Sequence, residues 1–209
     1  MELLLSKGAS IEVTNKYNNT QLQFAAQFGH TSIVELLLSK GASIEAVDNN
    51  NDTPLHHAAQ YGNTRTVELL LSKGASIEAT NMYKNTPLHL ATQFGHTSTV
   101  DLLLSKGASI EAMSKYNNTP LHLAAQYGNT STMELLLSKG ASIEATNIRN
   151  NTPLQLAAWN GKSSTVKLLL SKGASIGATN HDNNTPLHLA AQHGHTSTVE
   201  LLRSKGASI

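Results

Sequence analysis

The stretch NNTPLHLAAQYG at residues 117–128 recurs along the chain at one fixed spacing. The chain has five prolines, and each lies in a copy of this stretch: Pro54, Pro87, Pro120, Pro153 and Pro186. Successive prolines are 33 residues apart (87 − 54 = 33), and a further copy begins at Thr20 with Gln21 in place of proline. Self-similarity at such a period indicates a repeat protein, in which each unit touches only its neighbours.

Each copy predicts a pair of short helices. In the fourth copy Thr119 is placed to cap a helix that starts at Pro120, because the first helical position needs no amide hydrogen. Leu121, Ala124 and Ala125 fall on one face of that helix, and a glycine ends it. The predicted fold is all-α, a single array over residues 1–209. Its helix pairs are expected at 20–40, 53–73, 86–106, 119–139, 152–172 and 185–205, with a partial repeat at 1–13.

The second helix of each pair carries a triple leucine that can face both its partner helix and the next unit. Three second helices also have Ser and Glu at the spacing of a capping box: Ser32 with Glu35, Ser131 with Glu134, and Ser197 with Glu200. We therefore expect a Ser side chain to cap these helices.

An asparagine-rich link joins successive pairs. Five asparagines share one register, two residues before the capping threonine: Asn18, Asn51, Asn117, Asn150 and Asn183. Asparagine tolerates a positive φ angle better than other residues with a side chain, which predicts a tight turn at each link. Lys84 occupies the same register and is expected to strain or reshape its turn.

The order Thr-Pro-Leu-His, Ala-Ala, Gly-His, Val-Glu-Leu-Leu-Leu and Gly-Ala, at this period, resembles the ankyrin repeat family over essentially the whole chain. The resemblance implies a solenoid of stacked helix–turn–helix units with short hairpin-like fingers. Its concave side and finger tips would bind other proteins, without enzymatic activity. One departure is a threonine at a register that is usually aliphatic, as at Thr66 and Thr99. Its hydroxyl needs a hydrogen-bond partner, and we expect slightly weaker packing between units.

Composition narrows the classes of partner. The formal net charge is +1 and 14% of the residues are charged, so no strong field attracts nucleic acid or an anionic membrane. The chain has no cysteine, which leaves neither disulfides nor zinc–thiolate sites. No apolar run approaches the roughly 20 residues that span a bilayer. We expect a cytoplasmic monomer with no cofactor and neither nucleic acid nor membrane as a partner.

The histidines read as structural residues. His56, His89, His122 and His188 share a register that Gln23 and Gln155 fill in the other two copies. Glutamine forms hydrogen bonds but carries no proton near neutral pH, so the register predicts bonding to the threonine hydroxyl and nearby backbone. A second histidine register alternates with Asn and Lys and is interpreted as a turn position: His30, Asn63, His96, Asn129, Lys162 and His195.

No catalytic or metal-binding arrangement stands out. A zinc site needs three or four ligands at defined spacing, and no third ligand lies near His193 and His195. The recurring glutamates and lysines form two ladders with one member per repeat, such as Glu45 and Lys73, which we interpret as solvated surface charge.

The aromatic residues are the candidates for binding. One register at the end of the first helix holds Phe28, Tyr61, Phe94 and Tyr127, continued by Asn160 and His193. A finger-tip register holds Tyr17, Tyr83 and Tyr116, continued in the fifth repeat by Arg149. Trp159 stands where the other copies have glutamine, Lys84 and Arg149 would tune the charge, and Phe24 alone is expected in the core.

Two functions of different classes follow. The first is a protein-interaction module that binds a protein or peptide through these residues, favoured because the helix-end register degenerates to Asn160 and His193. Its alternative is that the aromatic stripe packs against its own neighbours. The second function is a structural spacer, one segment of a longer array. Any enzymatic activity would require a catalytic domain elsewhere.

Overall fold

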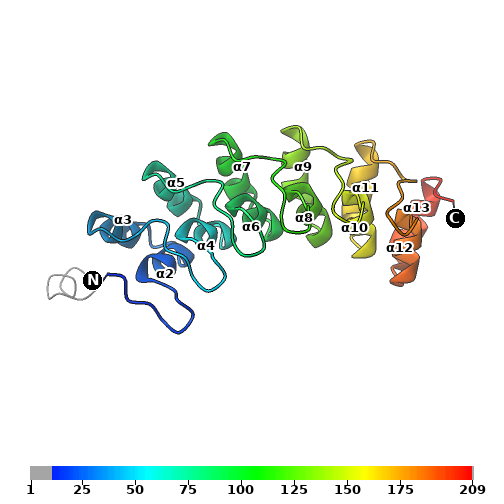
Figure 1. Cartoon of the computed structure of the whole chain (residues 1–209). Helices are drawn as coiled ribbons and strands as arrows, with labels where there is room; N and C mark the ends of the chain where they lie inside the picture. Colours follow the sequence, from blue (N-terminus) through cyan, green and yellow to red (C-terminus); the bar gives the residue numbers. More distant parts are fainter. Residues whose placement is uncertain (1–10, 209) are drawn as a thin grey trace. The chain divides into compact units, whose positions relative to one another are not determined.

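The computed structural model describes residues 11–208, in which all regular secondary structure is helical (Figure 1). The first helices of the pairs are α2 (Gln21–Gln27), α4 (Pro54–Gln60), α6 (Pro87–Gln93), α8 (Pro120–Tyr127), α10 (Pro153–Trp159) and α12 (Pro186–Gln192). The second helices are α3 (Thr31–Ser39), α5 (Thr64–Ser72), α7 (Thr97–Ser105), α9 (Thr130–Ser138), α11 (Ser163–Ser171) and α13 (Thr196–Ser204). Most of the predicted partial repeat at 1–13 lies outside the described residues.

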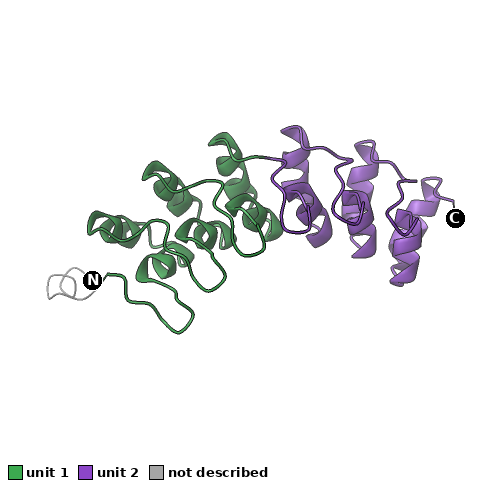
Figure 2. Cartoon of the chain, viewed as in Figure 1, with its two compact units in different colours: residues 1–109 green, residues 110–209 purple. Residues whose placement is uncertain are grey.

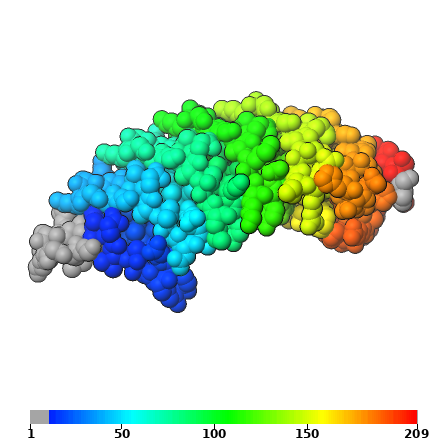
Figure 3. Space-filling model, in the orientation of Figure 1, coloured from blue at the N-terminus to red at the C-terminus, as the bar shows by residue number. Residues whose placement is uncertain are grey.

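The chain divides into two compact units, residues 1–109 and 110–209 (Figure 2). Within unit 1, α2, α4 and α6 pack side by side, and each packs on its own second helix. Unit 2 repeats this arrangement with α8, α10 and α12. Within each unit, a repeat therefore lies beside its sequence neighbours, which is visible as successive bands of colour (Figure 3). A single continuous array over residues 1–209 stays a prediction.

The core of each unit consists of small and aliphatic side chains. Ala58 and Ala59 of α4 are fully buried, as are Val67 and Leu70 of α5. Small alanines let neighbouring first helices approach closely, and the middle leucine of each second helix fills the space behind them. Aromatic side chains are not needed for this packing.

Phe24 corrects one prediction, because its side chain is 38% exposed and does not belong to the core. At the same register Leu90 and Leu123 are each 7% exposed. Among the described residues, α2 has a first-helix neighbour on one side only, which leaves the larger ring open.

The first helices start as predicted, with threonine as the N-cap. The predicted capping boxes of the second helices are wrong: α9 starts at Thr130 after Asn129, and no side chain caps it. Ser131 is therefore already inside the helix. The chain leaves Gly128 in a left-handed conformation (φ 81°) and enters the next helix within two residues, too early for Ser131 to act as a cap.

The six finger turns share one conformation. Lys84 has a φ angle of 54°, one degree below the range of its asparagine counterparts, which runs from 55° at Asn117 to 63° at Asn18. Its amide also donates to Asn81 O at 2.8 Å, as Asn150 N donates to Asn147 O at 2.9 Å. The prediction that lysine reshapes its turn is wrong. Hydrogen bonds around the turn hold lysine in a left-handed conformation that costs about 1 kcal/mol.

Candidate binding surface

The buried histidine register links neighbouring repeats within each unit, as the substitution by glutamine predicts. His122 Nδ1 accepts hydrogen bonds from Thr119 N (3.2 Å) and Thr119 Oγ1 (2.9 Å). Its Nε2 donates to Asn151 O at 3.0 Å, in the next finger. A backbone amide can only donate and a carbonyl can only accept, so the neutral ring with the proton on Nε2 is required. The structural interpretation of this register is confirmed.

Gln155 makes the same links in the fifth repeat. Its Oε1 accepts from Thr152 N at 2.9 Å, and its Nε2 donates to Asn184 O at 2.7 Å. The uncharged amide of glutamine therefore forms the same hydrogen bonds as the uncharged imidazole of histidine.

Burial keeps two of these histidines neutral. Burial lowers the pKa of His122 to about 4, against a weaker opposing effect from the carbonyl of Asn151. Burial also lowers the pKa of His56, and the nearby carboxylate of Asp52 offsets part of that effect. Neither ring gains a proton near neutral pH while the protein is folded.

The second histidine register has a role that the sequence interpretation missed. Three of its side chains, Asn63, His96 and His195, donate hydrogen bonds to the end of the preceding repeat's first helix. Asn63 Nδ2 bonds to Ala26 O at 2.9 Å, and His96 Nε2 bonds to Gln60 O at 2.9 Å. These residues are more than turn formers, because they satisfy orphan helix carbonyls and connect repeats.

Two further registers bond neighbouring repeats. The hydroxyls of Thr66, Thr99 and Thr198 each pair with a hydroxyl of the preceding repeat, as Thr66 Oγ1 does with Thr31 Oγ1 at 3.0 Å. The glutamate ladder is more than solvated charge, since Glu45 Oε1 accepts from Ser76 N at 2.7 Å. The sequence gives no hint of this bond, because its acceptor and donor are 31 residues apart.

Most aromatic side chains lie on the surface. The exposed fractions of seven range from 45% to 63%: Tyr17, Phe28, Tyr61, Tyr83, Phe94, Tyr116 and Tyr127. Lys84 and Arg149 are exposed on their fingers, and His193 is exposed at the end of α12. Trp159 and Asn160 are half-buried. A binding role for these residues stays a prediction.

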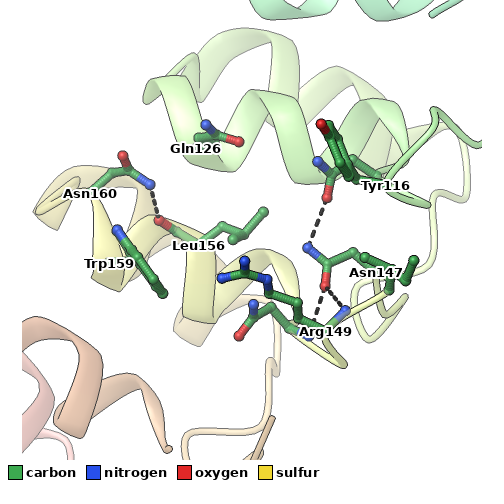
Figure 4. A pocket seen from close by; sticks show the side chains of 10 residues that line it. Tyr116, Gln126, Asn147, Arg149, Leu156, Trp159 and Asn160 are labelled. Atoms are coloured by element: carbon green, nitrogen blue, oxygen red, sulfur yellow. Dashed lines mark hydrogen bonds between the residues drawn. The ribbon is translucent and has the colours of Figure 1, made fainter. Parts of the chain in front are cut away.

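A hollow of about 360 Å³ lies in unit 2, between the finger loops and the first helices. It gathers four of the predicted binding residues, Tyr116, Arg149, Trp159 and Asn160, which are far apart in the sequence (Figure 4). Arg149 extends from its finger towards the side where Trp159 lies. The lining also includes six residues that the sequence interpretation did not select: Asn118, Gln126, Asn147, Ile148, Asn151 and Leu156.

Hydrogen bonds hold the finger side of the hollow in place. Asn147 Oδ1 accepts from Arg149 N (3.0 Å) and Asn151 N (3.1 Å), and Asn147 Nδ2 donates to Asn118 Oδ1 (2.9 Å). The backbone N–H of Ile148 donates to Tyr116 O at 3.0 Å, which joins the two fingers. The finger backbone is therefore fixed while the tip side chains stay exposed.

The helical side is held from the next repeat. His195 Nε2 donates to Trp159 O at 2.8 Å, and the His193 ring lies 4.5 Å from the Trp159 ring, centroid to centroid. Asn160 Nδ2 donates to Leu156 O at 2.8 Å. The ring distance places His193 and Trp159, two of the predicted binding residues, in direct contact.

Residues 11–208 contain neither a metal-binding cluster nor a membrane-spanning helix. No group of three or more His, Asp or Glu side chains in that part of the chain could hold a metal ion. No helix there is both long and apolar enough to cross a membrane.

The family model described as "Ankyrin repeats (3 copies)" matches residues 1–81, 79–147 and 144–209. The chain belongs to the ankyrin-repeat family. Ankyrin repeats generally act as protein-interaction modules, and the paired helices, stacked repeats and ordered fingers are those of an ankyrin solenoid. No curated protein matches the chain closely enough to count as a relative.

Proposed function

We propose that this ankyrin-repeat chain is a non-enzymatic interaction module that binds a protein or peptide through its finger tips and the ends of its first helices. One observation carries the proposal. Seven of nine aromatic side chains are at least 45% exposed, in two registers, while the core is built without them. Exposed aromatic groups at recurring positions are typical of protein interfaces, where Tyr and Trp contribute much of the binding energy.

The helix-end register supports binding over self-packing. Tyr61 and Phe94 are 49% and 48% exposed, so each ring keeps about half its surface in solvent. The same register accepts Asn160 and His193 in other repeats. Repeats with a polar side chain at this register form the same helix pair. The ring is therefore not required for folding and is available to contact a partner.

A site-specific cross-linking experiment in unit 1 tests the proposal. The photoreactive residue benzoylphenylalanine would replace Tyr83 at a finger tip, Phe94 at a helix end, or, as a control, the exposed Ser98 at the start of α7. Each variant would be irradiated in a lysate of the cells that encode the chain. We expect Tyr83 and Phe94 variants to capture the same protein and the Ser98 variant to capture none.

Equal capture from all three positions, or none from any, would contradict the proposal and favour a structural spacer. Melting temperatures measured by circular dichroism would show that all three variants fold.

We also propose a cytoplasmic, monomeric state without nucleic-acid or membrane partners, because the composition is cysteine-free and close to neutral in charge. Cell fractionation and light scattering would test these two points.

A further inference from the structure

Three residues that line the hollow in unit 2 differ from the residues at the same positions of the other repeats. Arg149 occupies a register that is otherwise Tyr, Asn or Asp, and Trp159 a register that is glutamine in the other five copies. Ile148 stands where other copies have Lys, Asn, Met or His. The other repeats form the same helices and turns without these residues. Folding therefore does not account for their presence together in one hollow.

The hollow presents hydrogen-bond donors without partners. The Arg149 guanidinium forms no ion pair or hydrogen bond with any residue of the described chain, 11–208. The indole N–H of Trp159 and the side-chain amide of Gln126 likewise bond to none of these residues. Arginine and the indole can only donate, and no Asp or Glu lines the hollow. The fitting ligand group is a negatively charged acceptor.

Apolar surface lies beside these donors. The Trp159 ring, Leu156 and Ile148 all line the hollow, and Ile148 is 55% exposed. A volume of about 360 Å³ lies at the lower end of the range for ligand sites, enough for one bulky side chain and a carboxylate. The ligand therefore combines an acidic group with an apolar neighbour.

We propose that the hollow binds an extended peptide segment of the partner through an Asp or Glu side chain on Arg149, with an adjacent bulky apolar side chain against Trp159 and Leu156. This inference rests on the proposed interaction function and names the chemistry of the partner. A single arginine favours a carboxylate, because phosphate recognition commonly uses several. The Gln126 amide is free to pair with the peptide backbone.

Asp182 is the acidic group to consider as a competitor for Arg149, since it occupies the same register in the next finger. Among the described residues it forms no ion pair with Arg149. Asp182→Asn would remove a negative charge near the arginine, and Asn50 shows that the register accepts asparagine. We expect this variant to bind an acidic peptide about twofold more tightly.

The test starts with selection from a phage library of random 12-residue peptides on the whole immobilised chain. The peptides are fused through their C-terminal ends, so they offer side-chain carboxylates only. We expect enriched peptides to share an Asp or Glu next to Trp, Phe, Leu or Met. Enrichment of peptides that lack a carboxylate would overturn the inference and leave the interaction function standing. A selection that enriches no peptide would overturn both.

An enriched peptide is then synthesised and titrated against variants built from residues that the chain itself uses at each register. Arg149→Asn copies Asn50, and Trp159→Gln copies Gln126. Arg65→Ser copies Ser98 and is the control for loss of one positive charge away from the hollow. We expect losses in affinity of about 30-fold for Arg149→Asn and Trp159→Gln, and less than about twofold for Arg65→Ser.

A double-mutant cycle decides the pairing. The peptide is also made with its Asp or Glu changed to the amide, and both peptides are measured on the original chain and on Arg149→Asn. Coupling of about tenfold between the two changes would support the contact. Independent, additive losses would overturn it, and binding abolished by Trp159→Gln alone would still support the interaction function. A synthetic peptide with a free C-terminal carboxylate and no acidic side chain should bind no better than its C-terminal amide.

Discussion

The second and fifth repeats both depart from the common pattern, the second at buried positions and the fifth mainly at exposed or half-buried ones. In the second repeat, Asp48, Asp52 and His57 replace the usual Asn, Asn and Leu, and all three are at most 9% exposed. In the fifth repeat, Arg149 and Ile148 point outwards, and Trp159 is half-buried. A departure from the repeat pattern is therefore not by itself a sign of function.

The inward changes of the second repeat lie beside other buried polar groups. His57 Nε2 lies 3.3 Å from Asp48 Oδ2, close enough for an ion pair but not aligned for a hydrogen bond. Asp52 Oδ1 accepts from Asn81 Nδ2 at 2.9 Å. In the fifth repeat, the Arg149 guanidinium and the Trp159 indole N–H have no hydrogen-bond partner among residues 11–208. A buried polar side chain is costly unless a polar group lies next to it, so changes inside a repeat come together. An exposed side chain has no such constraint and can change to suit a binding partner.

The largest expected effect is a loss of stability on removing a buried side chain of the second repeat. His56→Ala would leave Thr53 N and Asn85 O, which bond to the ring at 3.1 and 3.0 Å, without their side-chain partner. We expect the free energy of unfolding to fall by about 3 kcal/mol, because two buried polar groups and a cavity result. His56→Gln should cost less than about 1 kcal/mol, since Gln155 forms the same links. Urea denaturation would measure both, and equal losses would contradict the structural role.

The second-largest expected effect is a loss of stability at acid pH, which occurs where the buried register holds histidine and not where it holds glutamine, as in the fifth repeat. The pKa of His122 is about 4 in the folded protein and about 6.5 in an unfolded chain, so the folded state binds fewer protons below pH 6.5. Stability is thus intact above pH 6.5 and falls as pH drops towards 4. At pH 5 we expect this site to have lost about 2 kcal/mol. His122→Gln should remove that loss. If melting temperatures of the two proteins shift equally between pH 7 and 5, the linkage is wrong.

The smallest effect on stability belongs to the outward side of the fifth repeat. Arg149→Asn and Trp159→Gln, alone or combined, should change the free energy of unfolding by no more than about 0.5 kcal/mol, because other repeats carry these residues at the same registers. Urea denaturation would check this alongside the binding measurements. A loss above about 2 kcal/mol would assign both residues to the core and remove the contrast with the second repeat.

The period of 33, the helix pairs, the threonine caps and the structural role of the histidines follow from the sequence alone. They depend on contacts within three or four residues, or on comparing one copy with the next. The interchange of histidine and glutamine at one register was enough to predict a neutral, hydrogen-bonded side chain there.

Only the tertiary structure decided which departures face inwards. Contacts between neighbouring repeats, such as Asn81 with Asp52 and Asn63 with Ala26, join residues 29 and 37 positions apart, and local sequence carries no record of them. The hollow has the same origin. Tyr116, Arg149 and Trp159 meet because two fingers and two first helices stack in register, which brings together side chains that the sequence places in separate repeats.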